Sequence, residues 1–569
     1  MTSTIEISDL KISFPNSQGN TTVVQDLNLK IPRGKTMGLV GESGSGKSVT
    51  SLAIMQLLSK NAIINAGTIS LHLKDNKKTN LLSINENVLQ ELRGNRISMI
   101  FQEPMTALNP VIKCGKQVEE VIRIHQSISS KELKTKVLSL FKSVKLPNVD
   151  RIYKSYPHEL SGGQKQRLMI AIAMANEPEL LIADEPTTAL DVSVQKTILN
   201  LLKELQAQYK TSILFITHDL GVVAEIADEI AIMYKGELVE TGEVKQVLSQ
   251  PQHQYTKALL ACRPPVDSRP FRLPTISNLL DSLEDTNTRL ITKEERKAIH
   301  EKIYISPPIL QINDLEVAFD MKKNILGKTI ESFIAVKGVS FKLFKGETLG
   351  LVGESGCGKT SLSRAILGLQ KAKAGNIWWQ GDDILKYSSK QWREFRQKVQ
   401  IIFQDPYGSL NPVLTAGKAI MEPLLVHQKM NKQEAKIQAI ELLNKTGLPA
   451  EAFDKYPSEF SGGQRQRISI ARALAMKPEI IICDESVSAL DVSVQAQILN
   501  LLNQLKDEFE LSYLFISHDL SVVKYMSDRV MIMKEGKIIE TQEADTLFEH
   551  PQNDYTKMLI SSIPGMERE

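Results

Sequence analysis

Cysteine and net charge are both scarce in this chain. Its 4 cysteines, at positions 114, 262, 357 and 483, form no CxxC pair and no metal-type spacing. This pattern excludes a disulfide framework and a zinc site, and it is typical of a protein from a reducing cytosol. The formal net charge of +3, from 69 basic and 66 acidic residues, gives no broad field that attracts nucleic acid or an anionic membrane. We therefore expect no nucleic-acid partner, and partners selected by local surfaces.

Long apolar runs are missing as well. The apolar runs, such as LLIA from Leu180 and IIIC from Ile480, are far shorter than the ~20 residues of a membrane-spanning helix. The N-terminus lacks the basic start and apolar stretch of a signal peptide. If the protein acts at a membrane, we expect another chain to cross it. The length of 569 residues indicates more than one domain.

The sequence repeats itself once. SGGQKQRLMIAIAMANEPELLIADEPTTALDVSVQ begins at Ser161, and SGGQRQRISIARALAMKPEIIICDESVSALDVSVQ begins 300 residues later, at Ser461. At the same offset, ITHDLGVV matches ISHDLSVV and PQHQYTKALL matches PQNDYTKMLI. The offset is different upstream, and most of the length difference is expected in a surface loop around residues 74–80. Such self-similarity predicts two domains of one fold.

A polar segment separates the two repeats. It carries prolines near both ends, and its charged stretch ITKEERKAIHEK favours one short helix. About 40 residues of this kind can span two packed domains without setting their orientation. We therefore expect a first domain over 1–265, a linker over 266–308 and a second domain over 309–569.

Each half places a glycine-rich loop between a strand and a helix. KTMGLV-GESGSGKS and ETLGLV-GESGCGKT both satisfy GxxxxGK[ST] in the setting that the motif requires. The glycines let backbone N–H groups surround phosphates, the lysine adds a positive charge, and the last hydroxyl can ligate Mg²⁺. A glycine-rich turn that only packs would not explain the motif twice. The predicted phosphate-binding residues are Gly41, Glu42, Ser43, Gly44, Ser45, Gly46, Lys47 and Ser48, and Gly353, Glu354, Ser355, Gly356, Cys357, Gly358, Lys359 and Thr360.

Paired carboxylates end an apolar strand in each half. The strands are ELLIADE from Glu179 and EIIICDE from Glu479. We expect Asp184 and Asp484 to hold Mg²⁺, directly or through water, and Glu185 and Glu485 to act on the attacking water as general bases. The alternative, acidic caps of the next turn, leaves the nearby phosphate loops unexplained.

The SGGQ segments, each followed by an arginine-bearing helix and the Asp-Glu strand, resemble the signature of ATP-binding cassette (ABC) proteins. The matching residues are Ser161, Gly162, Gly163 and Gln164, and Ser461, Gly462, Gly463 and Gln464. The resemblance implies an α/β fold class with two tandem P-loop NTPase domains. Each would have a mixed sheet core, an N-terminal antiparallel β subdomain and a helical signature subdomain. It also implies that ATP joins the two domains in an intramolecular sandwich, in which each signature helix faces the γ-phosphate held by the other domain.

The same resemblance implies roles for further residues. Gln102 and Gln404 match the lid glutamines, which contact the metal and take part in hydrolysis. His218 and His518 match the γ-phosphate histidines. Ala189, Leu190 and Asp191, and Ala489, Leu490 and Asp491, match the interdomain loops. Phe14 and Phe319 are candidates for stacking on adenine; Phe333 competes in the second half, and any of the three can be core. Since neither half lacks a reactive group, we expect two competent ATP sites.

FQEPMTALNP and FQDPYGSLNP resemble the extended lid motif of importers for dipeptides, oligopeptides, glutathione and nickel, and the PQxxYTKxL elements strengthen the likeness. It implies an ATPase at the cytoplasmic face of the inner membrane, with two transmembrane permease subunits and a solute-binding protein as partners. Membrane contact would run only through the permeases. Cys262 stands alone where some relatives have a cysteine cluster, so no iron–sulfur cluster is expected.

Two other functions fit a tandem cassette ATPase. One is a soluble factor that acts on ribosomes or DNA, but such relatives carry a longer charged helical linker or inserted zinc cysteines, which are missing here. The other, nucleotide binding without turnover, conflicts with two full sets of reactive residues. The transported solute stays open, with small peptides ahead of glutathione, nickel chelates and opines. Closure between halves of one chain or of two chains also stays open.

Overall fold

The computed structural model describes residues 3–16, 19–73, 78–102, 107–187, 192–281, 289–323, 329–488 and 490–563. The chain divides into two compact units, Met1–Leu260 and Ala261–Glu569. Each unit contains one antiparallel four-stranded sheet and one six-stranded sheet in which five strands are parallel and the edge strand is antiparallel. Among the described residues, no helix is long and apolar enough to cross a membrane.

An antiparallel sheet opens the first unit, with strand order β2-β1-β4-β5. Its strands are β1 (Ser3–Asn16), β2 (Gly19–Pro32), β4 (Ile63–His72) and β5 (Lys78–Asn80). Alternate side chains of β1, such as Ile5 and Ile7, are buried, as expected for a strand with one face toward a core. Residues 78–80 were expected in a loop but form β5, because they pair with β4. Residues 74–77 lie outside the described part of the chain.

The six-stranded sheet of the first unit has the order β10-β9-β3-β8-β7-β6. Its strands are β3 (Thr36–Val40), β6 (Ile97–Ile100), β7 (Leu180–Asp184), β8 (Ser212–Thr217), β9 (Glu229–Tyr234) and β10 (Glu237–Glu243). Every residue of β3, β7 and β8 is buried, as expected for parallel strands covered on both faces. The carboxyl ends of parallel strands meet at one sheet edge, so the segments after β3, β6, β7 and β8 converge there.

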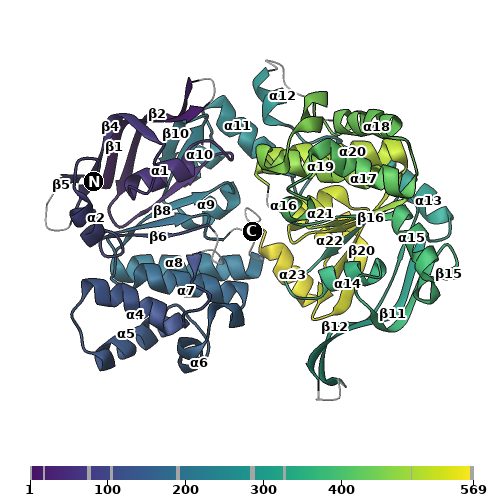
Figure 1. Cartoon of the computed structure of the whole chain (residues 1–569), viewed down its shortest axis with the longest axis horizontal. Helices are drawn as coiled ribbons and strands as arrows, with labels where there is room; N and C mark the ends of the chain where they lie inside the picture. The colour runs from purple at the N-terminus through teal and green to yellow at the C-terminus, as the bar shows by residue number, and fades with distance from the viewer. Residues whose placement is uncertain are drawn as a thin grey trace. The chain divides into compact units, whose positions relative to one another are not determined.

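The helices of the first unit cover this sheet and build a separate helical region. They are α1 (Lys47–Ile54), α2 (Glu86–Leu92), α4 (Cys114–His125), α5 (Ser130–Ser143), α6 (Val149–Lys154), α7 (Gly162–Met174), α8 (Val192–Tyr209), α9 (Leu220–Ile226), α10 (Val244–Ser249) and α11 (Gln254–Ala261). α4, α5 and α6 lie together beside α7 (Figure 1), and Val118, Val137 and Phe141 are fully buried between them.

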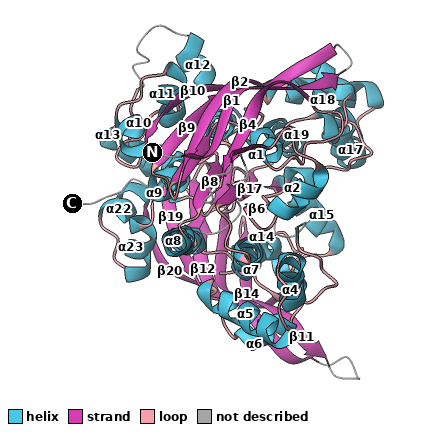
Figure 2. Cartoon of the chain, turned by 90° about the vertical axis from the view of Figure 1, so that its left-hand side faces the viewer, coloured by secondary structure: helices cyan, strands magenta, loops and turns pink. Residues whose placement is uncertain are grey.

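The second unit repeats this architecture. Its antiparallel sheet contains β12 (Thr329–Leu343), β11 (Leu310–Lys323), β14 (Ala372–Trp379) and β15 (Asp382–Asp383), and its six-stranded sheet contains β16 (Val399–Ile402), β17 (Ile480–Asp484), β18 (Ser512–Ile516), β13 (Thr348–Val352), β19 (Arg529–Lys534) and β20 (Lys537–Glu543). Its helices are α14 (Lys359–Ile366), α15 (Ser389–Lys398), α16 (Pro406–Ser409), α17 (Ala416–His427), α18 (Lys432–Lys445), α19 (Gly462–Leu474), α20 (Val492–Phe509), α21 (Leu520–Met526), α22 (Ala544–Glu549) and α23 (Asp554–Ser561). The expected α/β class, with mixed sheets, antiparallel β subdomains and helical signature subdomains, is confirmed; Figure 2 shows strands and helices by colour.

The segment expected as a linker, residues 266–308, is part of the second compact unit. We call it the connector. It contains α12 (Ile276–Asp281) and α13 (Lys293–Ile305), and α13 forms in the charged stretch where a short helix was expected. A capping box starts α13, because Thr292 accepts from the Glu295 N–H while Glu295 accepts from the Thr292 N–H.

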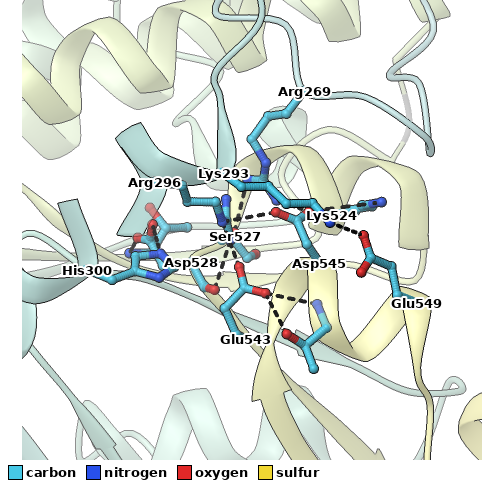
Figure 3. Close-up of polar contacts among 12 residues, drawn as sticks. Arg269, Lys293, Arg296, His300, Lys524, Ser527, Asp528, Glu543, Asp545 and Glu549 are labelled. Atoms are coloured by element: carbon cyan, nitrogen blue, oxygen red, sulfur yellow. Dashed lines mark hydrogen bonds and ion pairs between the residues drawn. The ribbon is translucent and has the colours of Figure 1, made fainter. Parts of the chain in front are cut away.

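Two arginines fasten the connector to the second unit (Figure 3). Arg269 donates to the carbonyl oxygens of Tyr525 and Ser527, at 3.0 and 3.1 Å, and lies 3.2 Å from the Asp545 carboxylate. Arg296 donates to Glu543 at 2.6 Å and lies 3.1 Å from Asp545. Both arginine side chains are about one-tenth exposed, so these charges are paired away from water. The connector is therefore a packed element of the second unit.

Candidate nucleotide-binding and hydrolysis sites

The glycine-rich loops follow β3 and β13 and lead directly into α1 and α14. Gly46 has φ 102°, in the left-handed region, and a Cβ atom there would lie 2.9 Å from the Val23 carbonyl oxygen. A Cβ at Gly41 would lie 2.3 Å from the Met233 carbonyl oxygen. The equivalent approaches at Gly358 and Gly353 are 2.4 and 2.2 Å. Only glycine fits these positions, so both loops keep the tight backbone curve that directs N–H groups toward phosphates.

The loop lysines are buried over the loops. Lys47 Nζ donates to the carbonyl oxygens of Gly41 and Glu42, each at 2.7 Å. Lys359 Nζ makes the same bonds to Gly353 and Glu354, at 2.6 and 3.0 Å. Both lysine side chains are about 5% exposed or less. A buried cation held on a tight glycine-rich loop at the start of a helix is suited to phosphate oxygens.

The aspartates at the ends of β7 and β17 lie against the loop hydroxyls. Ser48 Oγ donates to Asp184 at 3.3 Å, and Thr360 Oγ1 donates to Asp484 at 3.4 Å. Burial, then the charge of the adjacent Glu185, raises the pKa of Asp184 to about 6. Burial and the neighbouring Glu485 likewise raise the pKa of Asp484. Burial disfavours the charged form of each aspartate, so a nearby cation would stabilise it. Carboxylate and hydroxyl oxygens side by side are ligands that suit Mg²⁺.

The two glutamates after these aspartates adopt a strained backbone. Glu185 has φ 47° and Glu485 has φ 50°, where a residue with a Cβ rarely lies. The Glu185 N–H donates to the Ile216 carbonyl oxygen at 2.9 Å, and the Glu485 N–H makes the equivalent bond to Ile516. The neighbouring strand thus holds a conformation that costs about 1–3 kcal/mol. Positive φ also recurs at turn pairs such as Glu177 and Lys477, so what distinguishes the two glutamates is their place directly after the buried aspartates.

Glutamine and histidine side chains converge on each glutamate. Gln102 Nε2 donates to Glu185 at 3.1 Å, and His218 Nδ1 lies 3.2 Å from its other carboxylate oxygen. In the second unit, Gln404 Nε2 donates to Glu485 at 2.8 Å and His518 Nδ1 lies 3.5 Å from the same carboxylate. The groups that the sequence spread over more than a hundred residues are therefore assembled around one carboxylate per unit.

These contacts shift the histidine titrations. Burial lowers the pKa of His218, but the hydrogen bond to Glu185 and its charge outweigh burial, so the pKa of His218 is raised. The same balance, with Glu485 as partner, raises the pKa of His518. Burial alone would raise the pKa of Glu485, but His518 and Lys359 lower it. Glu485 is thus held as an anion, the form that a general base requires.

The signature segments form helix N-termini. Ser161 caps α7 and Ser461 caps α19, each in a capping box with the glutamine three residues later. A Cβ at Gly162 would meet no atom within 4 Å, whereas a Cβ at Gly163 would lie 2.9 Å from Val194. Gly463 is similarly close to Val494, at 2.3 Å. Gly162 therefore leaves the N-terminus of α7 uncovered. Gly163 and Gly463 allow α8 and α20 to pack closely against the signature helices.

Other predicted positions are placed as follows. Phe14 packs against the core of the first unit, while Phe319 and Phe333 are partly exposed and pair across β11 and β12. Leu490 is buried, and Asp491 precedes α20. The predicted residues Ala189, Leu190, Asp191 and Ala489 lie outside the described part of the chain.

Sequence reasoning missed some contributors to the sites. Ser363 Oγ donates to Asp484 at 3.4 Å, as a second hydroxyl beside Thr360. The Glu42 N–H donates to the hydroxyl of Tyr255, more than 200 residues away in the chain. The internal repeat is the sequence feature that could have identified these residues, because Ser363 matches Ser51 and Tyr255 matches Tyr555 in the other half.

Comparison with known proteins identifies the family of the chain. The "ABC transporter" family matches residues 24–188 and 336–488, and "Oligopeptide/dipeptide transporter, C-terminal region" matches 239–288 and 539–569. The chain is 44% identical over 564 residues to "Glutathione import ATP-binding protein GsiA" of Pectobacterium atrosepticum, covering 98% of this chain and 89% of that protein. The protein of that name from Escherichia coli K12 is 43% identical, with 99% and 90% covered. A solved structure of the ATP-binding cassette MJ0796 bound to ADP and Pi has a TM-score of 0.38 and 27% identity, covering 41% of this chain and 98% of that one.

Proposed function

Because the chain belongs to the ABC transporter family of ATP-hydrolysing proteins, we propose that it energises a membrane importer for small peptides or related solutes, with separate permease subunits. The observation that carries this proposal is the likeness to glutathione import ATP-binding proteins over 98% of the chain. Glutathione is itself a small peptide, and both halves match the C-terminal region of oligopeptide and dipeptide transporters. We place the protein at the cytoplasmic face of the inner membrane, held there by its permeases.

Each unit supplies one set of hydrolytic groups. The glycine-rich loop and Lys47 or Lys359 bind the β- and γ-phosphates of ATP. Ser48 and Asp184, with Gln102, would hold Mg²⁺ in the first unit, and Thr360, Asp484 and Gln404 would hold it in the second. When bound, Mg²⁺ neutralises charge on the phosphate oxygens.

The remaining groups act on the water. Glu185 and Glu485 take the proton of the attacking water, and His218 and His518 orient these carboxylates through the contacts at 3.2 and 3.5 Å. Gln102 and Gln404 hold the same carboxylates, so movement of either lid segment changes the position of the base. This arrangement links the permease-facing lid to hydrolysis.

The two signature helices complete the sites across the sandwich. We assign Ser461, Gly462, Gly463 and Gln464 to the site built on Lys47, and Ser161, Gly162, Gly163 and Gln164 to the site built on Lys359. Each capped helix end presents N–H groups and the positive end of its dipole, which suits a γ-phosphate. ATP then joins the two units, and hydrolysis releases them.

Exposed apolar side chains recur at matching places beside both lid glutamines. Phe101, Val111 and Ile124 are 41, 78 and 70% exposed, and the residues 302 positions later, Phe403, Val413 and Val426, are 39, 74 and 64% exposed. In the second unit a cleft of about 370 Å³ adjoins Phe403, and its lining combines apolar residues such as Pro423 and Met476 with Arg393, Arg396 and Arg472. Apolar surface repeated in both halves suits two similar partners, so we assign these surfaces to the two permeases.

Purification of the chain in mild detergent from its native membranes tests this function. We expect two multispanning permeases and a solute-binding protein to copurify, and the binding protein can then be used to identify the solute. Val111→Glu combined with Val413→Glu is expected to abolish copurification, whereas Ile305→Glu, an 83% exposed position on α13, is the matched control. Copurification of ribosomes in place of permeases would contradict the proposal.

A further inference from the structure

The PQxxYT element near the end of each repeat supplies none of the groups that bind Mg²⁺ or act on water in the sites described above. Its tyrosine lies at the start of α11 or α23 and is buried, with Tyr255 0% and Tyr555 7% exposed. The element begins 203 residues after Ser48 in the first repeat and 191 residues after Thr360 in the second. A buried tyrosine hydroxyl usually has a hydrogen-bond partner, so the partner of each hydroxyl is informative.

In the first unit the partner belongs to the phosphate-binding loop. The N–H of Glu42, the second residue of the loop, donates to Tyr255 Oη at 3.3 Å. The carbonyl oxygen of Glu42 accepts from Lys47 Nζ at 2.7 Å. Glu42 is thus fixed at its N–H by Tyr255 and at its carbonyl by the phosphate-binding lysine.

The element that carries Tyr255 is itself fastened to the edge of the six-stranded sheet. Glu240, on β10, accepts from the N–H groups of Gln252 and His253 at 2.8 and 3.1 Å. The ring of Tyr255 stacks on Tyr234, on β9, with 4.1 Å between ring centroids. Since β9 pairs with β3, the strand that feeds the loop, the tyrosine and the loop share one rigid base.

In the second unit the PQxxYT element is held to the sheet edge in the same way, but the contact between its tyrosine hydroxyl and the phosphate-binding loop differs. Glu540 accepts from the N–H groups of Gln552 and Asn553, again at 2.8 and 3.1 Å. Tyr555 lies beside the second loop, and burial, then the charge of Glu354, raises its pKa. Its buried hydroxyl lies close enough to Glu354 to interact with it, but among the described residues it makes no well-formed hydrogen bond. Lys534, which matches Tyr234, lies 4.6 Å from the centroid of the Tyr555 ring.

We propose that Tyr255 is a positioning residue for the first ATP site, where its hydroxyl fixes the Glu42 peptide and with it the curve of the phosphate-binding loop. Among the described residues, Tyr555 occupies the matching place beside Glu354 but makes no well-formed hydrogen bond there. The C-terminal region therefore sets ATP affinity more strongly at the first site than at the second. This inference concerns ATP binding and does not depend on the solute or on the permeases.

The test removes one hydroxyl at a time from the full chain while nucleotide binding at the other site is blocked. Tyr255→Phe is measured with Lys359→Ala, and Tyr555→Phe with Lys47→Ala, by equilibrium titration with Mg²⁺ and ATP. We expect Tyr255→Phe to raise the Kd for ATP roughly three- to tenfold, the range for loss of one hydrogen bond. The matched comparison, Tyr555→Phe, is expected to raise the Kd at the second site clearly less.

Further readouts separate positioning from a general loss of stability. Because the loop binds phosphates, the change should appear for ATP and ADP but not for AMP, and KM should rise more than kcat falls. If Tyr255→Phe does not fold, Glu240→Gln loosens the same element and is expected to raise the Kd at the first site in the same way. A lower melting temperature with unchanged Kd would overturn the proposal, as would equal increases of Kd at the two sites.

Discussion

Glu185 and Glu485 are each held by a strand carbonyl, a glutamine and a histidine, but the groups that support these contacts differ between the units. Asp184 accepts from one loop hydroxyl, whereas Asp484 accepts from Thr360 and Ser363. The reaction fixes the groups that face the phosphates and the water, while the residues behind them need only hold the geometry. The residues that face the phosphates and the water therefore repeat in both units, whereas residues behind them differ.

The residues that contact the connector differ more between the two units than the residues of the ATP sites do. Asp545, which pairs with both connector arginines, is matched in the first unit by Lys245, and Lys524 and Ser527 are matched by alanines. A lysine at the place of Asp545 would repel Arg269 and Arg296. The sequence difference therefore explains why the first unit offers these arginines no equivalent site, and why the connector packs on the second unit.

The strongest test of the comparison concerns the two glutamates. Glu185→Gln together with Glu485→Gln should lower the steady-state hydrolysis rate about 10²- to 10⁴-fold while ATP stays bound, because the general base is lost and the phosphate-binding groups remain. Phosphate release and retention of radiolabelled ATP measure the two effects. Each single variant should leave part of the activity, and the difference between the two singles measures how unequal the sites are. Unchanged hydrolysis in the double variant would contradict the assignment.

A second test concerns the connector. Arg296→Ala leaves the Glu543 and Asp545 carboxylates without their partly buried counter-charge, and it should lower the free energy of unfolding of the second unit by about 3 kcal/mol. All three tryptophans, Trp378, Trp379 and Trp392, belong to the second unit, so urea unfolding followed by tryptophan fluorescence reports on that unit alone.

The control for this test is Arg289→Ala. Arg289 pairs with Glu295 at 2.7 Å, but both side chains are exposed, and no measurable change is expected. Equal stability of Arg296→Ala and the unchanged protein would show that the connector is not fastened by its arginines.

The smallest expected effect is the pH dependence of the histidine contacts. The folded-state pKa of His218 lies above its ordinary value of about 6.5, so its contact with Glu185 adds stability that is fully present below pH 6.5. That stability is lost as the pH rises through the folded-state pKa. Calorimetry should therefore show a melting-temperature difference between the unchanged protein and His218→Gln that is larger at pH 6 than at pH 9.

His518→Gln provides the comparison for the second unit. Its Nδ1 lies 3.5 Å from Glu485, against 3.2 Å in the His218 pair, so a smaller difference is expected. A difference that grows with rising pH at either position would contradict this account.

Much of the fold and of the sites could be predicted because the signals are local. GxxxxGK[ST] needs glycines at defined places in one turn, and an apolar strand that ends in two carboxylates is visible over seven residues. The short strand β5 was not predicted, because Lys78–Asn80 is polar and forms a strand only by pairing with β4. The hydroxyl of Ser363 was not predicted for a similar reason, since one serine on a helix carries no sign of what it faces.

The sequence by itself determined that two copies of one α/β fold each carry a phosphate loop, an acidic strand end, a signature helix start and a histidine, because each of these is encoded by neighbouring residues. Only the tertiary structure decided which distant groups meet. The neighbouring strand fixes Glu185 in a strained conformation toward Gln102 and His218, Tyr255 reaches the Glu42 N–H, and the connector packs on the second unit. These contacts depend on how buried strands and charges pair across the fold, and no local pattern of residues specifies that pairing.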